Sequence, residues 1–324
     1  VPLEYGRDYD IDYLQGRLIL TRPLDIVVGS DTITSDLPRD GNRLYLIADY
    51  EFDASQDTGN ASYGLRTSRL LGKRLTLGGS YIQESLDSGE DYQLYGVDYQ
   101  FKLTSGITLT GEWARTQRSL ANRFYSDDGG LTYTEIDATT ANTKNDAWEL
   151  GLDLALAKEF KLAASYRFLG EGFSTSSLQA ANDISEYELE LNGKIVSDYN
   201  LLVRYYLEDE TNTLTISESV LQLSKQYHKL KLTEELRWQE YNAPAESYAD
   251  TLGAVRLDYQ LTDAASIYGS QQLTLDRSSV TPKNDRTTIG ANIDVTKKLQ
   301  VNLEGSQGDL GDGAMFGAEY QVNK

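Results

Sequence analysis

The chain has 324 residues, 40% of them hydrophobic, and a formal net charge of −20. The hydrophobic share is close to that of folded proteins and argues against disorder. The acidic balance argues against nucleic-acid binding, and the absence of Cys excludes disulfides, thiolate metal sites and thiol nucleophiles. No uninterrupted apolar stretch reaches the ~18 residues of a membrane helix, which excludes a helical membrane protein.

Residues 1–40 differ from the rest because they lack long strand-like runs. Two short runs, 8–13 and 17–20, flank Leu14-Gln-Gly16 and predict a β-hairpin. The hairpin resembles small β-modules of large bacterial envelope proteins, which implies a longer or multi-component protein. We predict that 1–40 is a periplasmic hairpin module or a plug in the mouth of a barrel formed by 41–324.

Period-2 alternation after this segment predicts sixteen strands. They span 42–53, 60–71, 74–85, 91–103, 106–117, 145–157, 159–171, 184–196, 198–208, 213–225, 227–240, 248–261, 264–276, 285–296, 298–307 and 313–322. Most exceed the ~5–6 residues of soluble strands and match or exceed the ~9–11 of tilted membrane strands. The predicted fold is therefore all-β, a transmembrane antiparallel barrel.

The predicted connections alternate in length, as tight periplasmic turns and longer extracellular loops do in transmembrane barrels. Short turns fall at Leu71–Lys73, Leu103–Ser105, Lys158, Ser197, Gln226, Thr262–Asp263 and Lys297. Longer polar segments fall at 54–59, 86–90, 118–144, 172–183, 209–212, 241–247, 277–284 and 308–312. None of the five prolines interrupts a predicted strand, which fits a closed hydrogen-bonded ladder.

The two faces of the strands differ in chemistry. In 148–156, Leu150, Leu152 and Leu154 share one face, and Glu149 and Asp153 share the other. Aromatic residues of the apolar face gather near the strand ends, as in the two girdles of a membrane barrel. The loop-side girdle comprises Tyr50, Phe52, Tyr63, Tyr81, Trp113, Trp148, Tyr166, Phe168, Tyr187, Tyr205 and Trp238; the turn-side girdle comprises Tyr99, Phe101, Phe160, Tyr199, Tyr259 and Tyr320.

Two positions depart from this pattern. The apolar phase shifts between Leu214/Ile216 and Leu221/Leu223, which predicts a bulge. Glu234 shares the apolar phase, an unfavourable position in contact with lipid unless the carboxylate is paired or the register breaks.

In architecture, residues 42–322 resemble Gram-negative outer-membrane barrels of the general-porin type. The chain lacks the terminal aromatic residue and the Pro-Glu-Phe-Gly-Gly-Asp loop motif of such porins. The resemblance implies that the third loop, 118–144, folds into the lumen. The facing side chains would be Asp127, Asp128, Glu135 and Asp137 on the loop and Arg167, Arg204 and Arg237 on the wall. An exterior hairpin is the alternative.

The inward phase of the strands carries an acidic excess, including Glu186, Glu188 and Glu190. It predicts either a salt-bridged wall or a transverse field across a pore, and the two are compatible. We therefore expect an outer-membrane channel for small hydrophilic solutes that favours cations. The alternative is a structural barrel that sheathes or anchors an envelope protein, with its lumen occupied.

Catalytic and metal chemistry are not expected. The only histidine, His228, falls at a predicted turn, where no triad or His-based zinc site can form. Asp309-Leu-Gly-Asp-Gly313 and Asp127-Asp-Gly-Gly130 lack the full spacing of a calcium loop and favour turns. We expect no cofactor, no metal and no enzymatic activity. The expected partners are membrane lipid, small solutes or cations, and an envelope protein; the sequence leaves the oligomeric state open.

Overall fold

The structure is a computed structural model that describes residues 9–12, 17–20, 32–34, 62–85, 91–117, 123–125, 134–136, 144–157, 159–173, 180, 182–195 and 199–320. Its regular elements are β-strands. Among these residues no helix is long and apolar enough to cross a membrane.

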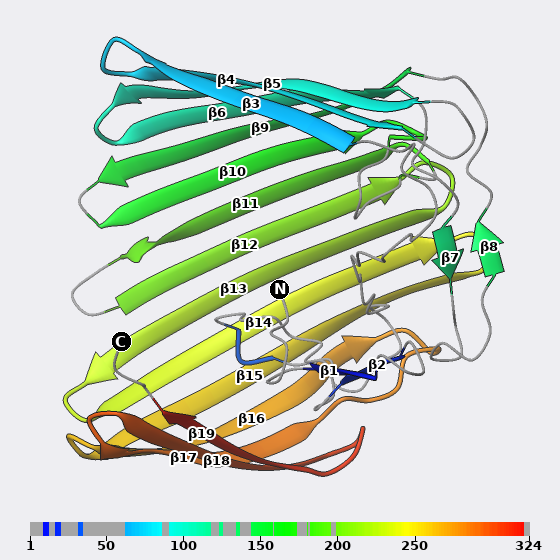
Figure 1. The fold of residues 1–324 in the computed structure, drawn as a ribbon. Coiled ribbons are helices and arrows are strands. Elements are labelled where there is room, and N and C mark those ends of the chain that lie inside the picture. The colour runs from blue at the N-terminus through cyan, green and yellow to red at the C-terminus, as the bar shows by residue number, and fades with distance from the viewer. Residues whose placement is uncertain are drawn as a thin grey trace.

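One antiparallel sheet of fifteen strands makes up most of the described chain (Figure 1). Each strand pairs with the next described strand of this sheet, and β6 pairs with β9 across the 118–143 connection. The strands are β3 (Ser62–Leu71), β4 (Leu75–Ser85), β5 (Asp91–Thr104), β6 (Ile107–Gln117), β9 (Lys144–Ala157), β10 (Phe160–Leu169), β11 (Ile184–Lys194), β12 (Tyr199–Glu210), β13 (Leu214–Tyr227), β14 (Leu230–Ala243), β15 (Glu246–Thr262), β16 (Ala265–Arg277), β17 (Arg286–Thr296), β18 (Leu299–Gly308) and β19 (Gly313–Tyr320). The predicted all-β class and meander of long strands are confirmed.

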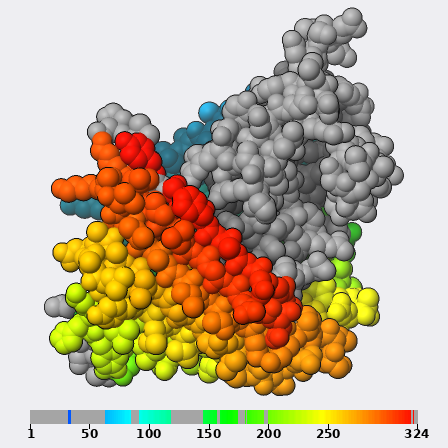
Figure 2. Space-filling model, turned by 90° about the horizontal axis from the view of Figure 1, so that it is seen from below, coloured from blue at the N-terminus to red at the C-terminus, as the bar shows by residue number. Residues whose placement is uncertain are grey.

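These fifteen strands correspond one to one with the last fifteen of the sixteen predicted. The first, 42–53, lies outside the described residues, together with Asp49, Tyr50, Glu51 and Phe52. The sheet's outermost described strands are β3 and β19. Figure 1 shows the sheet as a strongly curved wall, and in Figure 2 its C-terminal strands, yellow to red, form one continuous surface.

Several predicted connections differ from the structure in place or length, three of them as follows. The turn expected at Gln226 lies at His228–Lys229, where the exposed His228 adopts a positive φ of 50°. The 209–212 loop is three residues, 211–213, and the 241–247 loop is only Pro244 and Ala245. Backbone pairing continues past the apolar band because polar side chains do not prevent ladder hydrogen bonds. Tyr241 and Tyr248 stack across this extension, with ring centroids 4.9 Å apart.

The bulge predicted in 213–225 is also wrong. β13 pairs with β12 and β14 without a shift in register. Leu214 and Ile216 instead share the inner phase with Val220, which is only 1% exposed. The shift of the apolar residues from one face to the other is therefore not a shift in register. The inner face of β13 simply carries apolar side chains near the loop end of the strand.

The outer face of the sheet is apolar and exposed. Leu65, Ile289 and Phe316 are 70%, 67% and 71% exposed. Such a continuous apolar surface is unusual for a protein in water and typical of a lipid-facing wall. The predicted loop-side girdle is confirmed in part by ring contacts between neighbouring strands: Tyr63–Tyr81, Trp148–Tyr166 and Tyr166–Tyr187 centroids lie 6.4, 4.7 and 4.5 Å apart.

Two small hairpins accompany the sheet. β1 (Tyr9–Asp12) pairs with β2 (Arg17–Leu20), which confirms the N-terminal hairpin. β7 (Arg123–Tyr125) pairs with β8 (Thr134–Ile136), which confirms the hairpin within the longest loop. Within the described residues each hairpin forms a separate two-stranded sheet, and its strands pair with no strand of the large sheet. The division into 1–40 and 41–324 stays a prediction.

Candidate functional site

A row of mostly acidic residues crosses the inner face of the sheet. Its members stand directly opposite one another on successive strands: Asp98, Glu112, Glu149, Arg167, Glu186 and Glu208. We call this set the carboxylate row. Arg167 is its only cation and forms an ion pair with Glu186. Asp98 pairs with Arg66 at 3.1 Å. Glu112 has no ion pair among the described residues, so the row keeps an excess of negative charge.

The three arginines predicted to line a constriction all lie on the inner face. Each is held by a carboxylate of an adjacent strand: Arg167 by Glu186, Arg204 by Glu190 at 3.1 Å, and Arg237 by Glu218 at 2.5 Å. The salt-bridged wall is therefore present. These pairs offset the charge of the arginines, so the basic wall predicted from the sequence is largely neutralised.

The remaining predicted site residues divide into two groups. Glu188 lies on the inner phase, opposite Ser165 and Tyr206. Asp127, Asp128 and Asp137 lie outside the described residues, and only the backbone of Glu135 is described. Their approach to the wall arginines stays a prediction.

A different loop folds onto the inner wall. Phe173, 4% exposed, and Ala180, 1% exposed, form an apolar cluster with Ala147 and Leu169. Ala114 and Ile184 also pack against this cluster. On each strand the cluster residue is the next inward-facing position from the carboxylate row, on the side of the long loops. Chain from the 170–183 connection thus covers the inner wall near its loop end. The sequence signal was a lone aromatic residue within a polar, glycine-containing loop.

Backbone hydrogen bonds hold this in-folded loop. The Gly172 N–H donates to the Ala180 carbonyl at 2.7 Å, and the Ala180 N–H donates to the Phe173 carbonyl at 2.9 Å. Gly172 has φ +80°, a conformation that a residue with Cβ adopts only with strain. The Asp183 carboxylate accepts from the Glu171 N–H at 2.7 Å.

Closer to the short turns, residues 32–34 contact the inner wall near the middle of β14. We call Thr32–Ile33–Thr34 the docked tripeptide. The Glu235 carboxylate accepts hydrogen bonds from the Ile33 and Thr34 N–H groups, both at 2.9 Å, and from Thr34 Oγ1 at 2.5 Å. Gln222 Nε2 donates to the same carboxylate at 2.8 Å. Nothing in the local pattern of either segment predicts this contact.

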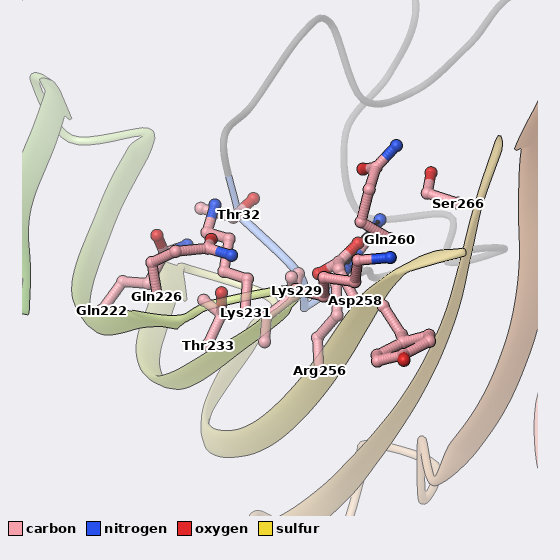
Figure 3. Close-up of a pocket in the computed structure, with 12 residues that line it drawn as sticks. Thr32, Gln222, Gln226, Lys229, Lys231, Thr233, Arg256, Asp258, Gln260 and Ser266 are labelled. Carbon is pink, nitrogen blue, oxygen red and sulfur yellow. Dashed lines mark hydrogen bonds and ion pairs between the residues drawn. The ribbon is translucent and has the colours of Figure 1, made fainter. Parts of the chain in front are cut away.

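The docked tripeptide borders a pocket of about 420 Å³ near the short turns (Figure 3). Basic and amide side chains line it, among them Gln226, Lys229, Lys231 and Arg256. In Figure 3 these side chains and Thr32 gather on the concave side of the strands. Arg256 is held by Asp258 at 2.8 Å, and its guanidinium lies 3.9 Å from the centroid of the Tyr268 ring. Tyr268 in turn donates to Glu304 at 2.5 Å.

Among the described residues no group of three or more acidic or histidine side chains is arranged to hold a metal ion.

A family model described as the β-barrel domain of the S-layer protein SlpA matches residues 17–201, more than half of the chain. The chain belongs to this family. The SlpA barrel-domain match runs from β2 into β12 and includes Phe173 and most of the carboxylate row. No curated protein matches the chain in sequence.

Solved structures that match this SlpA-type chain include porins and an outer-membrane protein. A porin refined at 1.8 Å resolution is 12% identical and has a TM-score of 0.43, with 81% of this chain and 100% of that chain covered. A loop-deletion mutant of OmpT, an outer-membrane protein of Vibrio cholerae, is 16% identical with a TM-score of 0.45 and coverages of 80% and 89%. The KdgM porin is 12% identical with a TM-score of 0.32 and coverages of 55% and 94%.

Proposed function

We propose that this SlpA-type barrel resides in the bacterial outer membrane and passes small hydrophilic solutes through its lumen, with a preference for cations. The carboxylate row carries the proposal, because it places uncompensated negative charge across the inner wall beside paired arginines. The exposed apolar outer face and its aromatic girdle support contact with membrane lipid. No catalytic role is assigned to the chain.

The preference for cations follows from which charges are paired. Arg167, Arg204 and Arg237 are held by wall carboxylates, whereas Glu112 and Glu188 have no ion pair among the described residues. Unpaired carboxylates raise the local concentration of cations within a Debye length, ~10 Å at 0.1 M salt and ~3 Å at 1 M. The preference should therefore weaken as salt rises.

The test is the reversal potential of purified protein in a planar bilayer under a salt gradient. Wild type should prefer cations, and the double substitution Glu112→Gln with Glu149→Gln should reduce the preference. Glu234→Gln, on the outer face, is the matched control and should leave it unchanged. A preference for anions in wild type would contradict the selectivity, and absence of conductance would contradict the channel.

We also propose, as the alternative, a structural role in which the barrel anchors or sheathes an envelope protein. Membership of an S-layer family favours it, as do Phe173 and the docked tripeptide, which occupy two places on the inner wall. The alternative predicts a closed lumen in the bilayer and co-purification of an envelope protein after cross-linking in cells. An open lumen without such a partner would contradict it.

A further inference from the structure

The burial of Glu235 depends on a segment about two hundred positions away in sequence. The residue is 3% exposed, and its carboxylate accepts four hydrogen bonds. Three come from Ile33 and Thr34, and the fourth comes from Gln222 on the neighbouring strand. All four donors are neutral, and no cation of the described residues forms an ion pair with Glu235.

Without the docked tripeptide this carboxylate would lose three of its donors. A carboxylate deprived of donors in a confined wall is unfavourable, and water must replace them. The two partners are therefore complementary. The wall supplies the two oxygens of the Glu235 carboxylate as acceptors, and the tripeptide supplies two consecutive N–H groups and a hydroxyl as donors. Hydrogen bonds to a charged acceptor are also among the stronger ones in proteins.

We propose that Glu235, supported by Gln222, is a docking site on the lumen wall whose partner is the chain's own Thr32–Thr34 segment. Two of the three contacts use consecutive backbone N–H groups at a bend of the chain, so the site recognises a bent peptide backbone, and the Thr34 hydroxyl adds selectivity for Ser or Thr at that position. The site holds whether or not the lumen conducts.

Docking also shapes the neighbouring pocket. Thr32 and Ile33 form part of its lining together with Lys229 and Lys231, and Figure 3 shows Thr32 near Lys231. The tripeptide thus forms one border of a pocket that basic side chains also line. Release of the tripeptide would enlarge this space and expose the Glu235 carboxylate to it.

The chain has no Cys, so one introduced thiol can report on docking. Ile33→Cys is placed in the full chain, and its rate of reaction with a water-soluble thiol reagent is measured in detergent. The rate is then measured again after adding Glu235→Ala or Thr34→Val. Because each removes hydrogen bonds to a charged group, we expect labelling to rise about tenfold or more with Glu235→Ala and less with Thr34→Val.

Glu304→Gln is the matched control, since Glu304 is a lumen carboxylate bound by Tyr268 rather than by the tripeptide. It should leave the labelling rate unchanged. Equal rates in all backgrounds, or an equal rise with Glu304→Gln, would overturn the docking site. If Glu235→Ala fails to fold, Thr34→Val decides, because it leaves the wall intact. The readout requires no conductance, so failure of the channel proposal does not affect it.

Discussion

Glu234 and Glu235 are consecutive in β14, yet they lie on opposite faces of the sheet. Glu234 is exposed on the outer wall, opposite Leu223 and Val255, and Glu235 is buried against Thr34. The register is unbroken at both positions, so the lipid-facing phase expected for Glu234 is confirmed. Among the described residues no cation pairs with Glu234. One step along a strand thus separates a carboxylate facing lipid from one that binds peptide.

Replacing Glu234 should stabilise the barrel. Glu234→Leu removes a charge from a lipid-facing position and should raise the free energy of unfolding by about 1 kcal/mol. Glu235→Leu should lower it, because the donors of Ile33 and Thr34 lose their acceptor. Urea unfolding in liposomes measures both, and loss of stability in Glu234→Leu would contradict the face assignment.

The outer and inner walls should respond differently to a new positive charge. Leu152 lies on the outer face, opposite Leu109 and Ala164, so Leu152→Arg should cost roughly 2–4 kcal/mol. Glu112→Arg, between Asp98 and Glu149 on the inner face, should be neutral or stabilising. Unfolding of both variants in the same lipid gives the comparison, and equal losses would contradict the assignment of faces.

Phe173 should determine how firmly its loop stays on the wall. Phe173→Ala should destabilise the folded loop by about 3 kcal/mol, because a buried ring leaves a cavity. Amide hydrogen exchange at Gly172 and Ala180 should accelerate, and single-channel conductance should rise. The control is Phe168→Ala on the outer face, which should change neither the amide exchange nor the conductance. Unchanged amide exchange in Phe173→Ala would contradict the packing of Phe173 against the inner wall.

The longest loop provides a separate test of the constriction. An inward 118–144 loop predicts that deleting 124–136 increases single-channel conductance and speeds the uptake of bulky solutes. An exterior hairpin predicts unchanged conductance. If a correctly folded deletion variant conducts as wild type does, the inward position of this loop is excluded.

A loop carboxylate gives a pH-dependent contribution to stability. Burial raises the pKa of the Asp285 carboxyl, but hydrogen bonds from Lys283 and the Thr274 N–H outweigh it, so its pKa lies below the ordinary 3.8. A lowered folded pKa means that the stabilisation is complete above the unfolded pKa and disappears as pH falls through the folded pKa.

Asp285→Asn should therefore destabilise the 278–285 loop near neutral pH. The difference from wild type should shrink as pH falls below about 4, near the ordinary Asp pKa. Limited proteolysis of this loop between pH 3 and 7 measures the difference. If the difference in proteolysis rate between wild type and Asp285→Asn grows as the pH falls, the lowered pKa of Asp285 is contradicted. Asp276→Asn is the control, because Asp276 caps only the adjacent Arg277 N–H among the described hydrogen bonds.

The sequence by itself determined the strands and their faces. Alternation with period 2 is a local property, so it located fifteen described strands and placed Arg167, Glu186 and Glu234 on the correct sides. It misjudged where strands end, as at Gln226 and Pro244, because backbone pairing continues wherever a partner strand is present, whatever the polarity of the side chains.

Only the tertiary structure decided which inner residues meet. Register across neighbouring strands paired Arg237 with Glu218, and folding of distant chain onto the wall joined Thr34 to Glu235 and Phe173 to Ala147. These contacts produce no repeating pattern in the sequence, because each needs only one donor or one aromatic ring at the right position. The first contact follows from the pairing of adjacent strands, and the other two form where chain outside the sheet lies against its inner face.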